Sequence, residues 1–144
     1  MVSEHKPIRT MLLAILVLGL IGTAVELLLL GHDEGLTQLA PLVLIGIGVP
    51  VTIWHAVAAT PLSLRMMRIM MVALIAGSMI GIVMHYRGSV EFQKEVDPSI
   101  HGYALFIKVM QSKAPPALAP GILAHLGLLG LVCTYLNRDR REKI

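Results

Sequence analysis

The chain contains four long apolar segments, and these limit what it can fold into. A helix needs about 20 apolar residues to cross the ~30 Å hydrocarbon core of a bilayer. With 56% hydrophobic residues and a mean hydropathy of +0.76, the 144 residues carry far more apolar surface than a soluble domain of this size buries. We therefore predict an all-α polytopic membrane four-helix bundle, formed by residues 1–144 as a single domain. The predicted helices cover about 8–30, 36–59, 68–86 and 118–136.

The longest connection, residues 87–117, contains an apolar segment of its own. Residues 99–111 are too few to cross a bilayer, and Ser99, which follows Pro98, is placed to cap a helix. We therefore predict a short interfacial helix over 99–111 that lies over the outer end of the bundle. Its apolar face would hold Ile100, Tyr103, Ala104, Ile107 and Met110.

Basic residues are distributed unequally between the two sides of this topology. Cytoplasmic segments of membrane proteins are enriched in Lys and Arg, so the richer side, with both termini, is expected to face the cytoplasm of a bacterial inner membrane. The same topology accounts for the net charge of +3 without a nucleic-acid partner. The terminal side holds Lys6, Arg9, Arg65, Arg68, Arg138, Arg140, Arg141 and Lys143, whereas the outer side holds Arg87, Lys94, Lys108 and Lys113.

Three ionisable side chains lie near the outer ends of the predicted helices, namely Glu26, His85 and His125. Ionisable groups in hydrocarbon cost a few kcal/mol unless they have a partner, a wet cavity or a function. Gly22 precedes Glu26 and Gly81 precedes His85 by one helical turn, and small residues mark places where membrane helices approach closely. We therefore expect all three side chains to point into the bundle at a similar depth.

Such a polar layer has three interpretations. The first is a hydrogen-bonded cluster that fixes helix register. The second is a proton-exchanging site associated with a quinol. The third is a transition-metal or haem site with Glu26, His85 and His125 as ligands, because carboxylate and imidazole are ordinary ligands for such metals. The spacing does not decide among them, since the sequence has no H-E-x-x-H or C-x-x-C-H motif.

Other polar residues accompany this layer or lie away from it. His55 follows Trp54 near the cytoplasmic end of its helix, and we interpret it as an interfacial anchor. The inner half of the bundle would then be plain scaffold. The further candidates at the outer face are His32, Asp33, Glu34 and His101.

Four stretches of the sequence carry a resemblance to a known group of proteins. They are residues 26–32, 85–92, 115–121 and 126–131. In them the chain resembles a family of short four-helix bacterial integral membrane proteins described only as hypothetical. The resemblance implies a class of membrane protein and brings no activity, cofactor or catalytic residue with it.

Two functions are compatible with these features. We expect a non-enzymatic accessory or structural subunit of a bacterial inner-membrane assembly, whose partners are the lipid bilayer and a larger complex or further copies of the chain. The alternative is a metal- or haem-binding protein associated with redox or quinol chemistry, with its site at the outer end of the bundle.

Overall fold

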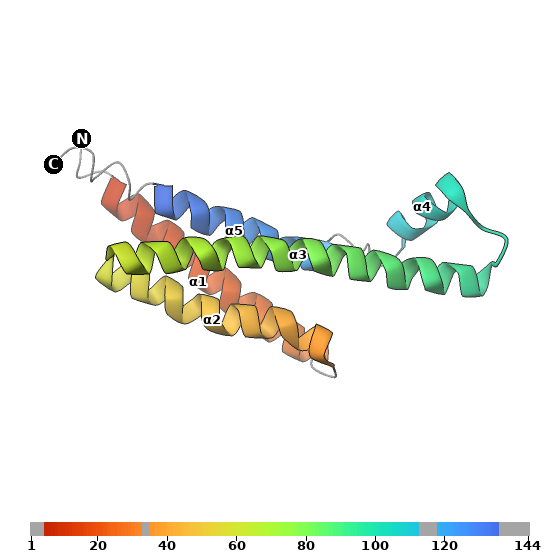
Figure 1. The fold of residues 1–144 in the computed structure, drawn as a ribbon, viewed down its shortest axis with the longest axis horizontal. Helices are drawn as coiled ribbons and strands as arrows, with labels where there is room; N and C mark the ends of the chain where they lie inside the picture. The colour runs from red at the N-terminus through yellow and green to blue at the C-terminus, as the bar shows by residue number, and fades with distance from the viewer. Residues whose placement is uncertain (1–4, 33–34, 113–117, 136–144) are drawn as a thin grey trace.

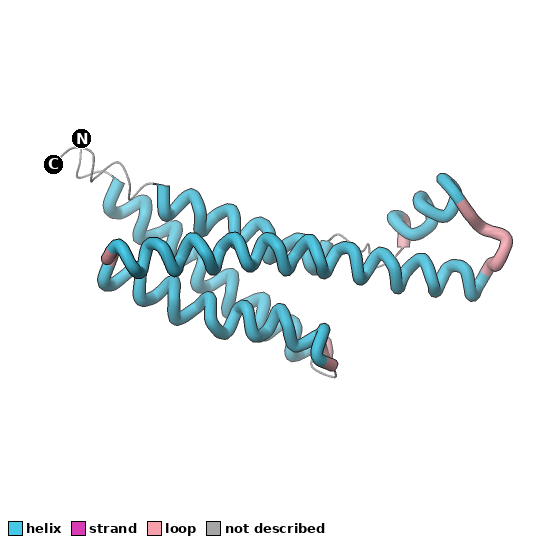
Figure 2. Tube along the Cα trace, in the orientation of Figure 1, coloured by secondary structure: helices cyan, strands magenta, loops and turns pink. Residues whose placement is uncertain are grey.

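The computed structural model describes residues 5–32, 35–112 and 118–135, and all the regular structure in these ranges is α-helical (Figures 1 and 2). The predicted all-α class is confirmed. Residues 113–117, the last predicted helical residue 136, and the candidates Asp33 and Glu34 lie outside the described residues. The elements are α1 (His5–Leu29), α2 (Leu36–Ala58), α3 (Pro61–Val96), α4 (Gly102–Met110) and α5 (Leu118–Tyr135).

Four of the helices, α1, α2, α3 and α5, pack side by side (Figure 1). α1 and α3 each contact α2 and α5, so α1 and α3 stand on opposite corners of the bundle. We call the end where α1 begins and α5 ends the terminal end, and the end at the α1–α2 turn the hairpin end. Fully buried core side chains include Leu16, Leu20, Met71 and Leu74.

Three helices are long and apolar enough to cross a membrane by length and composition: α1 from Pro7, α2 and α3. The apolar part of α5, Pro120–Tyr135, is shorter. Much of their surface in the single chain is apolar and exposed, as expected for helices that lipid surrounds. The fold is therefore that of a membrane protein.

α3 is much longer than the predicted helix 68–86. It starts at Pro61 because Thr60 caps it, accepting the Ser63 backbone N–H at 3.1 Å through its hydroxyl oxygen. At the other end the helix continues to Val96 through charged and polar residues. Glu, Gln and Lys have helix propensities similar to those of apolar helix formers, so they do not end the helix. Hydropathy marks only the apolar part of a helix, and for this reason the prediction ended too early.

The contacts of α3 show how far it leaves the bundle. Gly77 packs against Leu44 of the antiparallel α2, which places Leu36, the start of α2, level with about residue 85 of α3. At a rise of 1.5 Å per residue, the remaining residues 86–96 project by about 16 Å. Figure 1 shows this extension and α4 beside it.

α4 packs on this extension and on no other described helix. Leu105 and Val109 are buried there, and the ring of Phe106 lies 6.3 Å from that of Tyr86. Tyr103, predicted for the apolar face of this helix, is 77% exposed. The predicted helix 99–111 thus exists in shortened form, but the prediction that it covers the bundle is wrong.

The turn between α3 and α4 is held by Asp97. Its carboxylate accepts bonds from the Ser99 hydroxyl at 2.7 Å and the Ser99 backbone N–H at 3.1 Å. Ser99 therefore stabilises this turn and does not cap α4, whose N-cap residue is His101. The hydroxyl bond, with the backbone bond second, lowers the pKa of Asp97 below its usual range.

We expect Ser99→Ala to raise the pKa of Asp97 towards its usual range, as measured by NMR titration of the carboxyl carbon. Because the folded pKa is depressed, the turn gains stability above the usual Asp pKa and loses it as the pH falls through the folded value. Ser89→Ala, two turns earlier in α3, is the control and leaves the titration unchanged. An unaltered titration in Ser99→Ala would show that the turn does not form in solution.

Candidate functional site

His125 is the ionisable residue that is hardest to explain in a membrane. It lies on α5 with its side chain exposed, and its Nδ1 atom is 2.8 Å from the carbonyl oxygen of Gly121. A carbonyl only accepts, so Nδ1 carries the hydrogen and the neutral ring keeps a lone pair on Nε2. The described residues give that lone pair no hydrogen-bond donor.

The contacts between α3 and α5 fix the depth of His125. The two helices are antiparallel, and the Ser78 hydroxyl donates to the Pro120 carbonyl at 2.7 Å, so these residues are level. His125, five residues further along α5, is therefore level with about residue 73 of α3. The bundle part of α3 runs from Pro61 to about residue 85, which places His125 near the middle of the bundle.

The prediction that Glu26 points into the bundle is wrong, because its side chain is exposed. Gly19, on the same face of α1, does pack closely, since a Cβ atom there would lie 2.6 Å from Leu126 of α5. Glu26 lies seven residues nearer the hairpin end and is therefore level with the start of α5. Among the described residues, α5 does not extend past this level, so it leaves the carboxylate uncovered.

The three predicted ligands also lie at different depths. Measured from His125 along the helix axes towards the hairpin end, Glu26 lies about 9 Å away and His85 about 18 Å away. Glu26 and His85 stand on the diagonal helices α1 and α3. Among the described residues no three His, Cys, Asp or Glu side chains come together. The structure therefore does not assemble Glu26, His85 and His125 into one site.

His85 has a neighbour in His32, a pairing that the sequence did not predict. Its ring lies 6.0 Å from the ring of His32, with the two planes at 11°. His32 follows Gly31, which ends α1 in the left-handed conformation at a φ of 64° and turns the chain over the hairpin end. His101 is exposed at the start of α4, away from this pair.

Comparison of the chain with protein-family profiles, with curated proteins and with solved structures gives no match.

The terminal end is not plain scaffold, and the interpretation of His55 as an interfacial anchor is wrong. His55 is fully buried, with Nδ1 3.1 Å from the Ser63 hydroxyl oxygen. That hydroxyl donates to the Thr60 carbonyl, so it accepts from the ring, and the Nε2 lone pair is left buried without a donor among the described residues. The two-residue turn after α2 brings Ser63 back onto His55.

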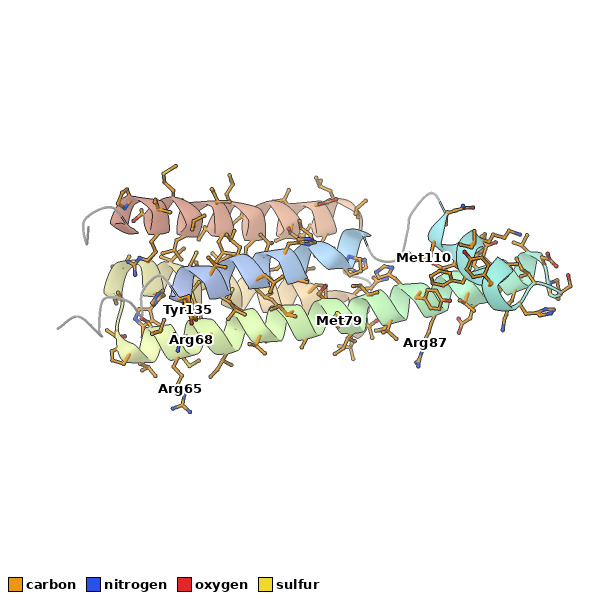
Figure 3. All side chains as sticks on the ribbon, turned by 90° about the horizontal axis from the view of Figure 1, so that it is seen from above. Arg65, Arg68, Met79, Arg87, Met110 and Tyr135 are labelled. Carbon is orange, nitrogen blue, oxygen red and sulfur yellow. The ribbon has the colours of Figure 1, made fainter. Side chains whose placement is uncertain are left out.

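Two arginines, Arg9 of α1 and Arg68 of α3, lie at the same end of the bundle as this buried ring. Both are near enough for their charges to act on His55. Arg68 also donates from Nε to the Thr134 hydroxyl at 3.3 Å, which joins α3 to the end of α5. Figure 3 shows Arg68 beside that end of α5, whereas Arg65 points away from the bundle. This polar cluster ties the terminal ends of the helices together.

Proposed function

We propose that this chain is a non-enzymatic subunit of a bacterial inner-membrane assembly and acts by binding other membrane helices. The observation that carries the proposal is His125, an exposed imidazole near the middle of an apolar bundle. Polar side chains at this depth normally face the interior of a bundle or an aqueous cavity. A polar side chain that is exposed at this depth in the single chain is explained if a helix of another subunit covers it in the assembly.

The proposal includes a fourth crossing by α5 and cytoplasmic termini. Support for the crossing comes from contacts along the length of α5, from Pro120 with Ser78 to Thr134 with Arg68. Support for the orientation comes from basic residues at the terminal end, where Arg65 and Arg68 lie in the first turns of α3. Lipid surrounds the rest of the exposed apolar surface.

Glu26 on α1 supports the same function nearer the hairpin end. It is exposed near the hairpin end, and Gly22, one turn below, is open, because a Cβ atom there would meet nothing within 4 Å. Small residues allow close approach of a second helix, and polar side chains hydrogen-bond across membrane interfaces. The exposed residues of α1 and α5 therefore have the composition of contact faces.

The proposal is tested by native electrophoresis of membranes solubilised in digitonin. The wild-type chain of 15.6 kDa should migrate in an assembly larger than one chain in a micelle. Loss of an interhelical hydrogen bond costs about 1–2 kcal/mol in model membrane helices, so His125→Leu should weaken association roughly 5- to 30-fold. The control is Val72→Leu, an exposed position of similar depth on α3. Wild-type protein that migrates as a monomer would overturn the proposal.

A further inference from the structure

His32 and His85 bring two imidazole rings together from different parts of the chain. The ring centres are 6.0 Å apart and the ring planes meet at 11°. His32 follows the end of α1, whereas His85 lies on α3. Within the described residues, neither ring has a hydrogen-bond partner. A neutral imidazole has one nitrogen lone pair, so each ring keeps a lone pair that nothing in these ranges occupies.

The backbone holds both histidines in place before any ligand binds. The His32 backbone N–H donates to the Leu27 carbonyl at 2.9 Å, across the left-handed Gly31 that closes α1. His85 lies within the uninterrupted helix α3. Side chains on a backbone that is already fixed lose less freedom when they bind a common ligand. The two rings are therefore preorganised as a pair.

The separation of the rings suits one metal ion between them. A histidine nitrogen binds zinc at about 2.0–2.1 Å and lies about 1.1 Å from its own ring centre, so each ring centre is about 3.2 Å from the ion. Two such centres are about 5.2 Å apart at a tetrahedral angle and about 6.4 Å apart when the ligands are opposite. The observed 6.0 Å lies between these limits.

The pair lies where water and ions reach the chain. The bundle part of α3, residues 61–85, is about 36 Å long, which exceeds the ~30 Å hydrocarbon core. At the hairpin end His85 is exposed and His32 is half-buried. Among the described residues no third His, Cys, Asp or Glu joins the pair, so water would complete the coordination of an ion.

We infer that His32 and His85 bind one divalent transition-metal ion of the zinc class, which fixes the α1–α2 turn to α3. Neutral imidazole suits zinc, copper and nickel, whereas Mg²⁺ and Ca²⁺ take oxygen ligands. Ring packing alone also allows this spacing, but the two explanations predict different responses to zinc. The inference goes beyond the proposed assembly function and does not depend on it.

Isothermal titration calorimetry of the purified full chain in detergent with Zn²⁺ tests the site. We expect one Zn²⁺ per chain and at least about tenfold weaker binding in His32→Ala and in His85→Ala, because losing even a group behind a ligand costs 10- to 100-fold. His101→Ala, an exposed histidine away from the pair, is the matched control and keeps full affinity. Mg²⁺ in place of Zn²⁺ should give no binding. Binding that survives either substitution, or falls as far in His101→Ala, overturns the site.

Hydrogen exchange separates a bridge from binding at one ring. If the ion joins the rings, the turn opens only when the ion leaves, so Zn²⁺ at ten times its dissociation constant should slow exchange of the Gly31 and His32 amides about tenfold. His85→Ala, on a different helix, should abolish this protection, and His101→Ala should retain it. Turn amides that exchange equally fast with and without zinc would overturn the bridge.

The zinc measurements and the assembly measurement have independent outcomes. A chain that binds zinc in this way but migrates as a monomer supports the metal site and overturns the assembly function. A chain that assembles but binds no zinc does the reverse. Because the side chain of His85 is exposed, its removal should leave the bundle folded, which circular dichroism checks.

Discussion

Gly127→Ala is expected to lower the free energy of unfolding by about 1–3 kcal/mol, because it forces α5 away from α3, the helix against which Gly127 packs. A Cβ atom at Gly127 would lie 2.8 Å from the backbone carbonyl oxygen of Met71 and 2.7 Å from a side-chain carbon of Ile75. A side chain can change rotamer to make room, but the backbone of α3 cannot move without displacing its own neighbours.

Unfolding of Gly127→Ala by dodecyl sulfate in mixed micelles measures this effect. Gly46→Ala is the matched control, since Gly46 is also helical and a Cβ atom there would meet nothing within 4 Å. Replacing an open helical glycine by alanine is expected to leave stability unchanged or raise it by about 0.5–1 kcal/mol. If both variants unfold alike, α3 and α5 do not pack as closely as the structure shows.

Ser63→Ala is expected to cost about 1–3 kcal/mol, because it leaves the buried Nδ1–H of His55 without an acceptor. His55 already holds one unpaired atom, Nε2, so after the substitution neither nitrogen of a fully buried ring would be paired within the described residues. The measurement is the same dodecyl sulfate unfolding.

A double-mutant cycle separates the hydrogen bond from the general effect of the serine. If the bond between His55 and Ser63 accounts for the loss, Ser63→Ala has a much smaller effect in a His55→Leu background, where no ring N–H remains to be satisfied. Equal losses in the two backgrounds would show that Ser63 acts only through its bond to Thr60. Ser89→Ala, in the part of α3 beyond the bundle, controls for loss of a serine elsewhere.

The sequence predicted the bundle helices well where hydropathy and helix ends coincide. The predicted ranges 8–30, 36–59 and 118–136 differ from α1, α2 and α5 by at most three residues at each end. The end of α3 could not be predicted in the same way, because its last turns contain charged residues that are nevertheless helical. A hydropathy pattern contains no signal for a helix that continues beyond the membrane.

The candidate site was harder to predict, because its members had to be placed in depth and direction together. Gly81 does mark a close contact, as predicted, with Pro120 of α5. Gly77, one turn earlier on the same face, packs against a different helix, at Leu44 of α2. The depth of His125 depends on how α5 is aligned with α3 along their axes. The contact between Ser78 and Pro120 fixes that alignment, and the sequence alone does not show it. By contrast, the pairing of His55 with Ser63 had a readable signal, a polar residue just past a two-residue turn.

The length of α3 has a mechanical consequence. One uninterrupted helix of 36 residues connects the buried cluster at the terminal end with α4 at the far side. Such a rod acts as a lever arm: a change of about 10° in its tilt, with about 35 Å between the bundle midpoint and the tip, displaces the tip by roughly 6 Å. A flexible loop of equal length would absorb that movement. A small change in how the bundle helices pack on α3 is therefore amplified at α4.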